Sequence, residues 1–125
     1  TDILSTVEEM NRRGIDFMTT PKSYFDDLPR RLEELKITNV TQDLKELERL
    51  HILLDGGNDK YMLQIFLKEA AVLYGEQKAG PFFYEIIQRA GDPGFGYGNF
   101  SALFRSIERA QKAKDLAQRN PAGAA

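Results

Sequence analysis

Residues 81–89 constrain the fold of this chain most strongly, because they combine a strand pattern with a carboxylate. The run is rich in aromatic and β-branched residues, starts at a proline and ends before a glycine-rich segment, which predicts a β-strand. Side chains alternate between the two faces of a strand, so Phe83, Glu85 and Ile87 share one face. Both faces are largely apolar, which predicts a strand buried on both sides. Glu85 therefore needs a partner, and a structural hydrogen bond or salt bridge, a metal ion and a catalytic role all remain open.

A glycine-rich segment, residues 91–98, follows this strand. It lacks the Lys and Ser/Thr spacing of a phosphate-binding loop and contains no GxGxxG run, so it does not predict nucleotide binding. We expect it to turn the chain from strand to helix and to present Phe95 and Phe100.

The composition of the chain excludes several classes of protein. The 125 residues suit one domain, and 42% hydrophobic and 29% charged residues are ordinary for a globular protein. A net charge of −2 with no basic block does not predict nucleic-acid binding, and the absence of cysteine excludes disulfides and Cys-based metal sites. No apolar run approaches the ~20 residues of a membrane span, so a cytoplasmic protein with no membrane partner is expected.

The first half of the chain predicts three helices. Apolar spacing indicates a helix over residues 2–13 that ends at Gly14, followed by a short strand at 15–18. Thr20 is expected to cap a second helix, which Pro29 should break or kink. Thr41 is expected to cap a third, short helix.

The second half predicts a hairpin and a closing helix. Residues 51–55 and 60–67 read as strands around a turn at 56–59, with Gln64 as a polar residue among apolar neighbours. Asn99 is expected to cap a helix that runs to about Gln118. The predicted inner face of that helix consists of Phe100, Leu103, Phe104 and Ile107.

This order of elements predicts an α+β fold, with helices on one side of a mostly antiparallel sheet and a C-terminal helix. A helix followed by three strands makes up most of a βαβββ unit, whose first strand would precede Thr1. Residues 1–118 are expected to form one part of a domain and residues 119–125 a disordered tail.

Three motifs resemble the C-terminal portion of the 4-hydroxyphenylpyruvate dioxygenase family, which has the vicinal-oxygen-chelate fold. They are Leu-Gln-Ile-Phe at 63–66, Phe-Tyr-Glu-Ile-Ile-Gln-Arg at 83–89 and Gly-Phe-Gly-Tyr-Gly-Asn-Phe at 94–100. They occur in the family's order, and weaker similarity extends from the first helix to about Gln111.

The resemblance implies a site for Fe(II), held by two His and one Glu so that substrate and oxygen can also bind. Glu85 matches the metal-binding Glu. The positions that would line the substrate pocket are Gln64, Phe66, Phe83, Phe95, Asn99, Phe100 and Leu103.

The two His ligands have no counterpart in these 125 residues. His51 matches a position that is not a ligand in the family, and a lone His at a strand edge is more often structural. We therefore expect the upstream remainder of a larger enzyme to supply both ligands. The chain by itself is expected to be inactive, and either to be marginally stable or to associate through its exposed sheet edge and apolar surface. A homo-oligomer is expected for the complete enzyme.

The function implied is the oxidation of 4-hydroxyphenylpyruvate by O2 to homogentisate and CO2, in tyrosine catabolism. One alternative is a hydroxymandelate synthase, which uses the same substrate and iron. The other is a non-catalytic module that keeps the fold without metal.

Overall fold

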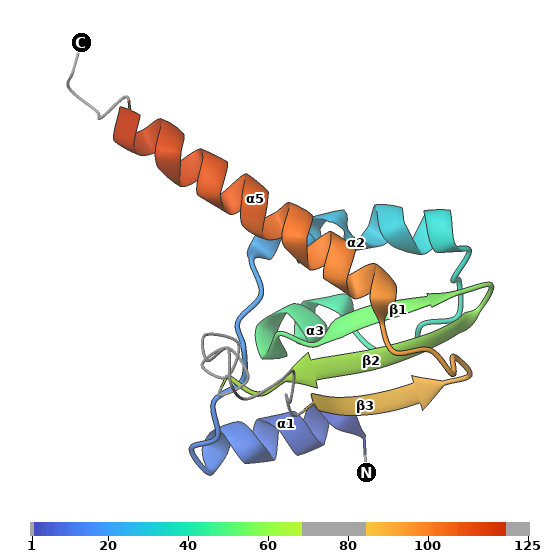
Figure 1. The fold of residues 1–125 in the computed structure, drawn as a ribbon. Coiled ribbons are helices and arrows are strands. Elements are labelled where there is room, and N and C mark those ends of the chain that lie inside the picture. Colours follow the sequence, from blue (N-terminus) through green and yellow to red (C-terminus); the bar gives the residue numbers. More distant parts are fainter. Residues whose placement is uncertain (1, 69–84, 120–125) are drawn as a thin grey trace, which may run out of the picture.

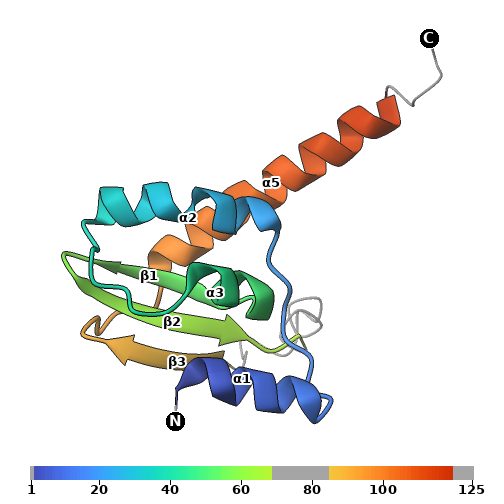
Figure 2. The same cartoon turned by 180° about the vertical axis from the view of Figure 1, so that it is seen from behind.

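The computed structural model describes residues 2–68 and 85–119, which form a small antiparallel sheet with helices against both faces (Figures 1 and 2). Its strands are β1 (Leu53–Gly57), β2 (Lys60–Phe66) and β3 (Glu85–Ala90), in the order β1-β2-β3. The helices among the described residues are α1 (Ile3–Arg12), α2 (Lys22–Leu35), α3 (Leu44–Leu50) and α5 (Tyr97–Arg119). The predicted antiparallel sheet and C-terminal helix are confirmed. The helices do not lie on one side of the sheet as predicted, because β2 is buried on both faces and helices cover both.

The hairpin between β1 and β2 forms as predicted. Gly57 pairs with Lys60, and the two residues between them, Asn58 and Asp59, both have positive φ, as a type I′ turn requires. The strand begins at Leu53 rather than at His51, because His51 adopts a left-handed conformation and ends α3.

The register of the sheet separates its residues into two faces. Gln64 lies opposite Ile87, and Phe66 lies opposite Glu85, so these four side chains share one face. On the other face, the side chain of Gln88 accepts a hydrogen bond from the first N–H of α1, that of Ile3 (2.6 Å). Figure 2 shows α1 and α3 against this second face, whereas α5 starts on the face of Gln64.

The core is one cluster of buried side chains between the sheet and the helices. Leu47, Ile52, Leu54, Leu63 and Ile65 are among its most buried members. Burial of these apolar side chains supplies the main driving force for folding.

Helix α2 differs from the prediction at two places. It continues through Pro29, which is exposed, because the buried residues Tyr24, Leu28 and Arg31 anchor the helix on both sides of the proline. Its first residue is Lys22, and the preceding Pro21 takes the cap position without a side-chain bond, so the predicted Thr20 cap is wrong. In α3 the cap is Asp43, two residues after the predicted Thr41.

Strand β3 is half-buried, so the prediction of burial on both faces is wrong. It is the last strand in the order of the described sheet, and its final residues, Arg89 and Ala90, are exposed. The predicted strand residues 81–84, including Phe83, lie outside the described residues, as does the expected tail after Arg119. Residues 15–18 form a single bridge, from Phe17 to Leu67, instead of a strand.

Helix α5 crosses the sheet with its first turns and then extends beyond the rest of the fold (Figure 1). Its buried residues are Asn99, Ala102 and Ser106. Phe104 and Ile107, predicted to face inward, are 68% and 49% exposed, because the buried stripe of the helix is one position away. No helix among the described residues has the length and apolar character of a membrane span.

Candidate functional site

The candidate site lies where the ends of β2 and β3 meet the first turns of α5. Glu85 is the first residue of β3 and is half-buried, with Phe66 beside it on β2. The rings of Phe66 and Phe100 lie 5.9 Å apart, which is within the range of attractive aromatic contact. Phe66 is thus the strand partner of Glu85, and its ring joins this position to Phe100 on α5.

The side chain of Glu85 accepts a hydrogen bond from Gln64 Nε2 (2.9 Å). Within residues 2–68 and 85–119, no Lys, Arg or His forms an ion pair with this carboxylate. The structure therefore favours an amide partner over the salt bridge that the sequence left open.

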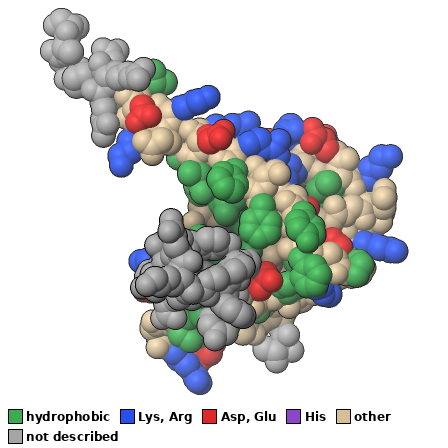
Figure 3. Space-filling view, viewed as in Figure 1, with side chains coloured by type: hydrophobic (Ala, Val, Ile, Leu, Met, Phe, Trp, Pro, Cys, Tyr) green, Lys and Arg blue, Asp and Glu red, His purple; other side chains and the backbone are tan. Residues whose placement is uncertain are grey.

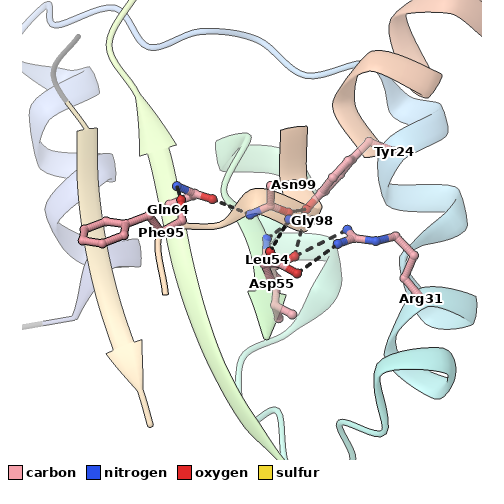
Figure 4. Close-up of polar contacts among 8 residues, drawn as sticks. All are labelled: Tyr24, Arg31, Leu54, Asp55, Gln64, Phe95, Gly98 and Asn99. Carbon is pink, nitrogen blue, oxygen red and sulfur yellow. Dashed lines mark hydrogen bonds and ion pairs between the residues drawn. The ribbon is translucent and has the colours of Figure 1, made fainter. Parts of the chain in front are cut away.

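Gln64 connects Glu85 to the interior of the protein. It is fully buried, and its Oε1 accepts a hydrogen bond from Asn99 Nδ2 (2.6 Å). Asn99 Oδ1 in turn accepts from the hydroxyl of Tyr24 on α2 (2.5 Å). Figure 4 shows Asn99 between Gln64 and Tyr24, so three elements meet through polar side chains.

Asn99 is not the cap of α5, as the sequence had predicted, because the helix starts two residues earlier at Tyr97. The cap comes from β1 instead, where Asp55 Oδ2 accepts from the backbone N–H of Gly98 (2.7 Å). Asp55 also faces Arg31 Nη2 on α2 (3.4 Å), and both side chains are buried (Figure 4).

Tyr24 is a neutral hydrogen-bond donor at this site. Its ring is buried, and burial raises the pKa of its hydroxyl. The guanidinium of Arg31 lies 5.4 Å from the centre of the Tyr24 ring, and this cation–π contact helps to hold the ring in its orientation.

The other predicted site residues lie around this cluster. Phe95 is 59% exposed, with Arg89 stacked on its ring at 5.5 Å, and Phe100 and Leu103 are half-buried. Figure 3 shows hydrophobic side chains gathered beside the first half of α5, on the face that carries the site. Phe83 lies outside the described residues.

Sequence reasoning missed Tyr24, Arg31 and Asp55 as parts of the site. Tyr24 occurs at helical spacing with apolar residues such as Leu28, which indicates a core position, and a tyrosine in the core usually requires a hydrogen-bond partner for its hydroxyl. Its partners lie 30 and 75 positions away, so no local pattern identifies them.

The described residues fit only part of the triad that binds Fe(II). They hold no group of three His, Cys, Asp or Glu side chains that could bind a metal ion. His51 Nδ1 accepts a hydrogen bond from the backbone N–H of Thr20 (3.0 Å), which supports a structural role. Glu85 is suitable as a ligand through one oxygen atom. The hydrogen bond from Gln64 is made to Oε2, so Oε1 is the atom that could bind a metal ion.

Comparison with known proteins gives the family context. The chain is 42% identical over 111 residues to the 4-hydroxyphenylpyruvate dioxygenase of Caenorhabditis briggsae, covering 89% of this chain and 26% of the relative. The enzyme of the same name from Pseudomonas aeruginosa is 40% identical over 112 residues, covering 88% of this chain and 28% of the relative. The chain is a homologue of one part of the 4-hydroxyphenylpyruvate dioxygenases.

A solved structure is also similar to the chain. A triple mutant of 4-hydroxymandelate synthase from Streptomyces coelicolor matches with a TM-score of 0.57 and 32% identity, over 88% of this chain and 28% of that chain. No protein-family model matches the sequence. The chain spans about a quarter of the length of its dioxygenase relatives.

Proposed function

We propose that this chain supplies the carboxylate ligand and part of the aromatic wall of a non-haem Fe(II) dioxygenase. The reaction converts 4-hydroxyphenylpyruvate and O2 to homogentisate and CO2, a step of tyrosine catabolism in the cytoplasm. Homology to enzymes of that name supports the proposal. The observation that carries it is the position of Glu85, which is half-buried, lies opposite Phe66 and accepts a hydrogen bond from an amide rather than from a cation.

Each residue has a distinct role in this proposal. Glu85 would be one ligand of the iron, and two imidazoles from the upstream remainder of the enzyme would complete the set. Bound Fe(II) supplies the chelation of the 2-oxoacid and the activation of O2. Gln64 holds the Glu85 carboxylate by hydrogen bonding to one of its oxygens.

The aromatic residues would bind the substrate and exclude water. Phe66 and Phe100 already lie in ring contact, and Phe95 and Leu103 add apolar surface at the same end of α5. The substrate ring would pack on these groups, with Phe83 as a further member of the wall. Gln64 lies two residues before Phe66 and Asn99 immediately before Phe100, and we propose that these two amides orient the substrate.

Hydroxymandelate synthase activity is the second candidate, because a structure of that enzyme resembles the chain at 32% identity. It would use the same residues and the same metal but place oxygen on the side chain of the substrate. A metal-free module of the same fold is the third reading. Both are outcomes of the experiment below.

The test is a chimaera in which this chain replaces the matching segment of the Pseudomonas aeruginosa enzyme. We expect it to bind about one equivalent of Fe(II) and to release homogentisate and CO2. Glu85→Gln should abolish iron binding, whereas Glu108→Gln, on the exposed face of α5, should leave it unchanged. Hydroxymandelate as the product would favour the second candidate, and a folded chimaera that binds no iron would favour the third.

A further inference from the structure

We infer that Tyr24 is a positioning residue whose hydroxyl, acting through Asn99, fixes the orientation of the Gln64 amide toward Glu85. The inference rests on the proposed function only in regarding Glu85 as the metal ligand. The four side chains form one continuous series of hydrogen bonds that starts in the core and ends at the half-buried carboxylate.

The hydroxyl of Tyr24 fixes the direction of the series. Its oxygen accepts from the backbone N–H of Leu54 (3.0 Å), so its single proton is left to donate. Two acceptors compete for that proton, Asn99 Oδ1 at 2.5 Å and the carbonyl of Leu54 at 3.1 Å. The carbonyl of Leu54 already accepts from Arg31 Nη1 (3.4 Å). Asn99 Oδ1 is therefore the preferred acceptor, because it is closer to the hydroxyl.

Each amide then has one possible orientation. Because Asn99 turns Oδ1 to the hydroxyl, its Nδ2 faces Gln64 Oε1, and Gln64 must turn Nε2 toward Glu85. Reversing either amide would place two donors or two acceptors against each other in a buried position. Such a mismatch leaves buried polar groups without a hydrogen-bond partner, which destabilises the reversed orientation.

The orientation of Gln64 matters because Glu85 is an acceptor when ionised. An N–H group directed at the carboxylate stabilises it and holds it in place, whereas a carbonyl oxygen in the same position would repel it. Tyr24 does not touch Glu85, and its influence passes through two intervening side chains. Removing residues that orient a metal ligand through hydrogen bonds typically lowers metal affinity by about 10–100-fold.

Tyr61 provides a matched control for the loss of a buried tyrosine hydroxyl. It is 4% exposed and donates to Gln42 (2.8 Å), a residue that belongs to no part of the series from Tyr24 to Glu85. Its side chain points to the opposite face of β2 from Gln64, since the two positions differ by an odd number.

The experiment compares Tyr24→Phe with Tyr61→Phe in the 125-residue chain by ¹⁵N NMR of side-chain amides. We expect Tyr24→Phe to shift the signals of both Asn99 and Gln64 and to speed exchange of their N–H protons by about tenfold or more. Tyr61→Phe should change neither. Unchanged amide signals in Tyr24→Phe, or equal changes in both variants, would overturn the inference.

A measurement on the unmodified chain decides the case if Tyr24→Phe does not fold. Nuclear Overhauser contacts from the Tyr24 hydroxyl to Asn99, and from Asn99 Nδ2 to Gln64, are expected together with slow exchange of both amides. Fast exchange at both would overturn the inference.

In the iron-binding chimaera, Tyr24→Phe should weaken Fe(II) binding by about tenfold or more. A chimaera without iron would contradict the proposed function, while the amide signals would still test the positioning role.

Discussion

Gly96 lies so close to Gln64 that a Cβ at position 96 would be 1.8 Å from Gln64 Oε1. Gly96 also has a φ of +79°, a conformation that favours glycine. The loop before α5 can therefore pass over the buried amide only because this residue has no side chain.

Gly96→Ala is expected to destabilise the chain by about 2–5 kcal/mol, since strain from positive φ adds to displacement of Gln64. Gly14→Ala is the control, because Gly14 has a φ of +91° but nothing within 4 Å of an added Cβ. It should cost only about 1–2 kcal/mol. Urea unfolding measures both, and equal losses would show that the contact with Gln64 has no effect.

Asp55→Ala should cost about 3–5 kcal/mol, because it leaves the buried guanidinium of Arg31 without its carboxylate partner and removes the cap from Gly98. The matched variant is Asp26→Ala, which breaks an exposed ion pair with Lys22. That pair should contribute less than about 1 kcal/mol. The midpoints of chemical unfolding compare the two, and a loss at Asp55 as small as that at Asp26 would contradict the capping role.

Glu85→Gln is expected to change the stability of the isolated chain by less than about 1 kcal/mol, because a glutamine oxygen can still accept from Gln64. Glu85→Ala should cost about 1–3 kcal/mol, since the buried Gln64 Nε2 then keeps only its longer contact with the Phe95 carbonyl (3.5 Å). Thermal unfolding of the isolated chain measures this structural effect apart from metal binding, because the chain supplies only one of the proposed ligands. If both variants had the same stability, the hydrogen bond to Gln64 would have no energetic role.

Replacing both Phe104 and Ile107 by Ser is expected to leave stability within about 0.5 kcal/mol, because both side chains are largely exposed. The same change should reduce self-association, since it removes exposed apolar surface. Sedimentation velocity at several concentrations provides the measurement. A large loss of stability would mean that these residues belong to the core, as the sequence had suggested.

Asp59 should make stability depend on pH. The backbone N–H of Thr38 donates to Asp59 Oδ1 (2.7 Å), and this bond, with a second from the Thr38 hydroxyl, lowers the pKa of Asp59. A lowered pKa in the folded state stabilises the fold above the unfolded value of about 4, and this stabilisation is lost as the pH falls through the folded value. Asp59→Asn should therefore differ most from the unmodified chain at neutral pH and least in acid. A difference that grows on acidification would contradict the assignment.

Several elements could be predicted from the sequence because short-range interactions fix them. The Asp2 side chain caps α1, and Gly14 follows its end, as the local residue types indicate. The hairpin follows from alternating apolar residues around a turn. Gln64 and Asn99 were both predicted as site residues, and the structure joins them by a hydrogen bond.

The start of α5 shows why the rest could not be predicted. A local rule makes Asn99 a cap, because it considers only neighbours in the chain. In the structure Asp55, which lies 43 positions earlier, accepts from Gly98 N–H, so the helix begins earlier and Asn99 becomes a buried connector.

The sequence by itself determined the hairpin, the strand that carries Glu85 and the extent of α1, because spacing and turn residues act over a few positions. It also indicated the similarity to the dioxygenases, through three motifs that occur in the same order as in that family. Only the tertiary structure decided which polar side chains meet: Tyr24 with Asn99, Arg31 with Asp55 and Gln64 with Glu85. These contacts join residues 75, 24 and 21 positions apart, and they form because buried polar groups must find partners wherever the packing of helices and strands brings them.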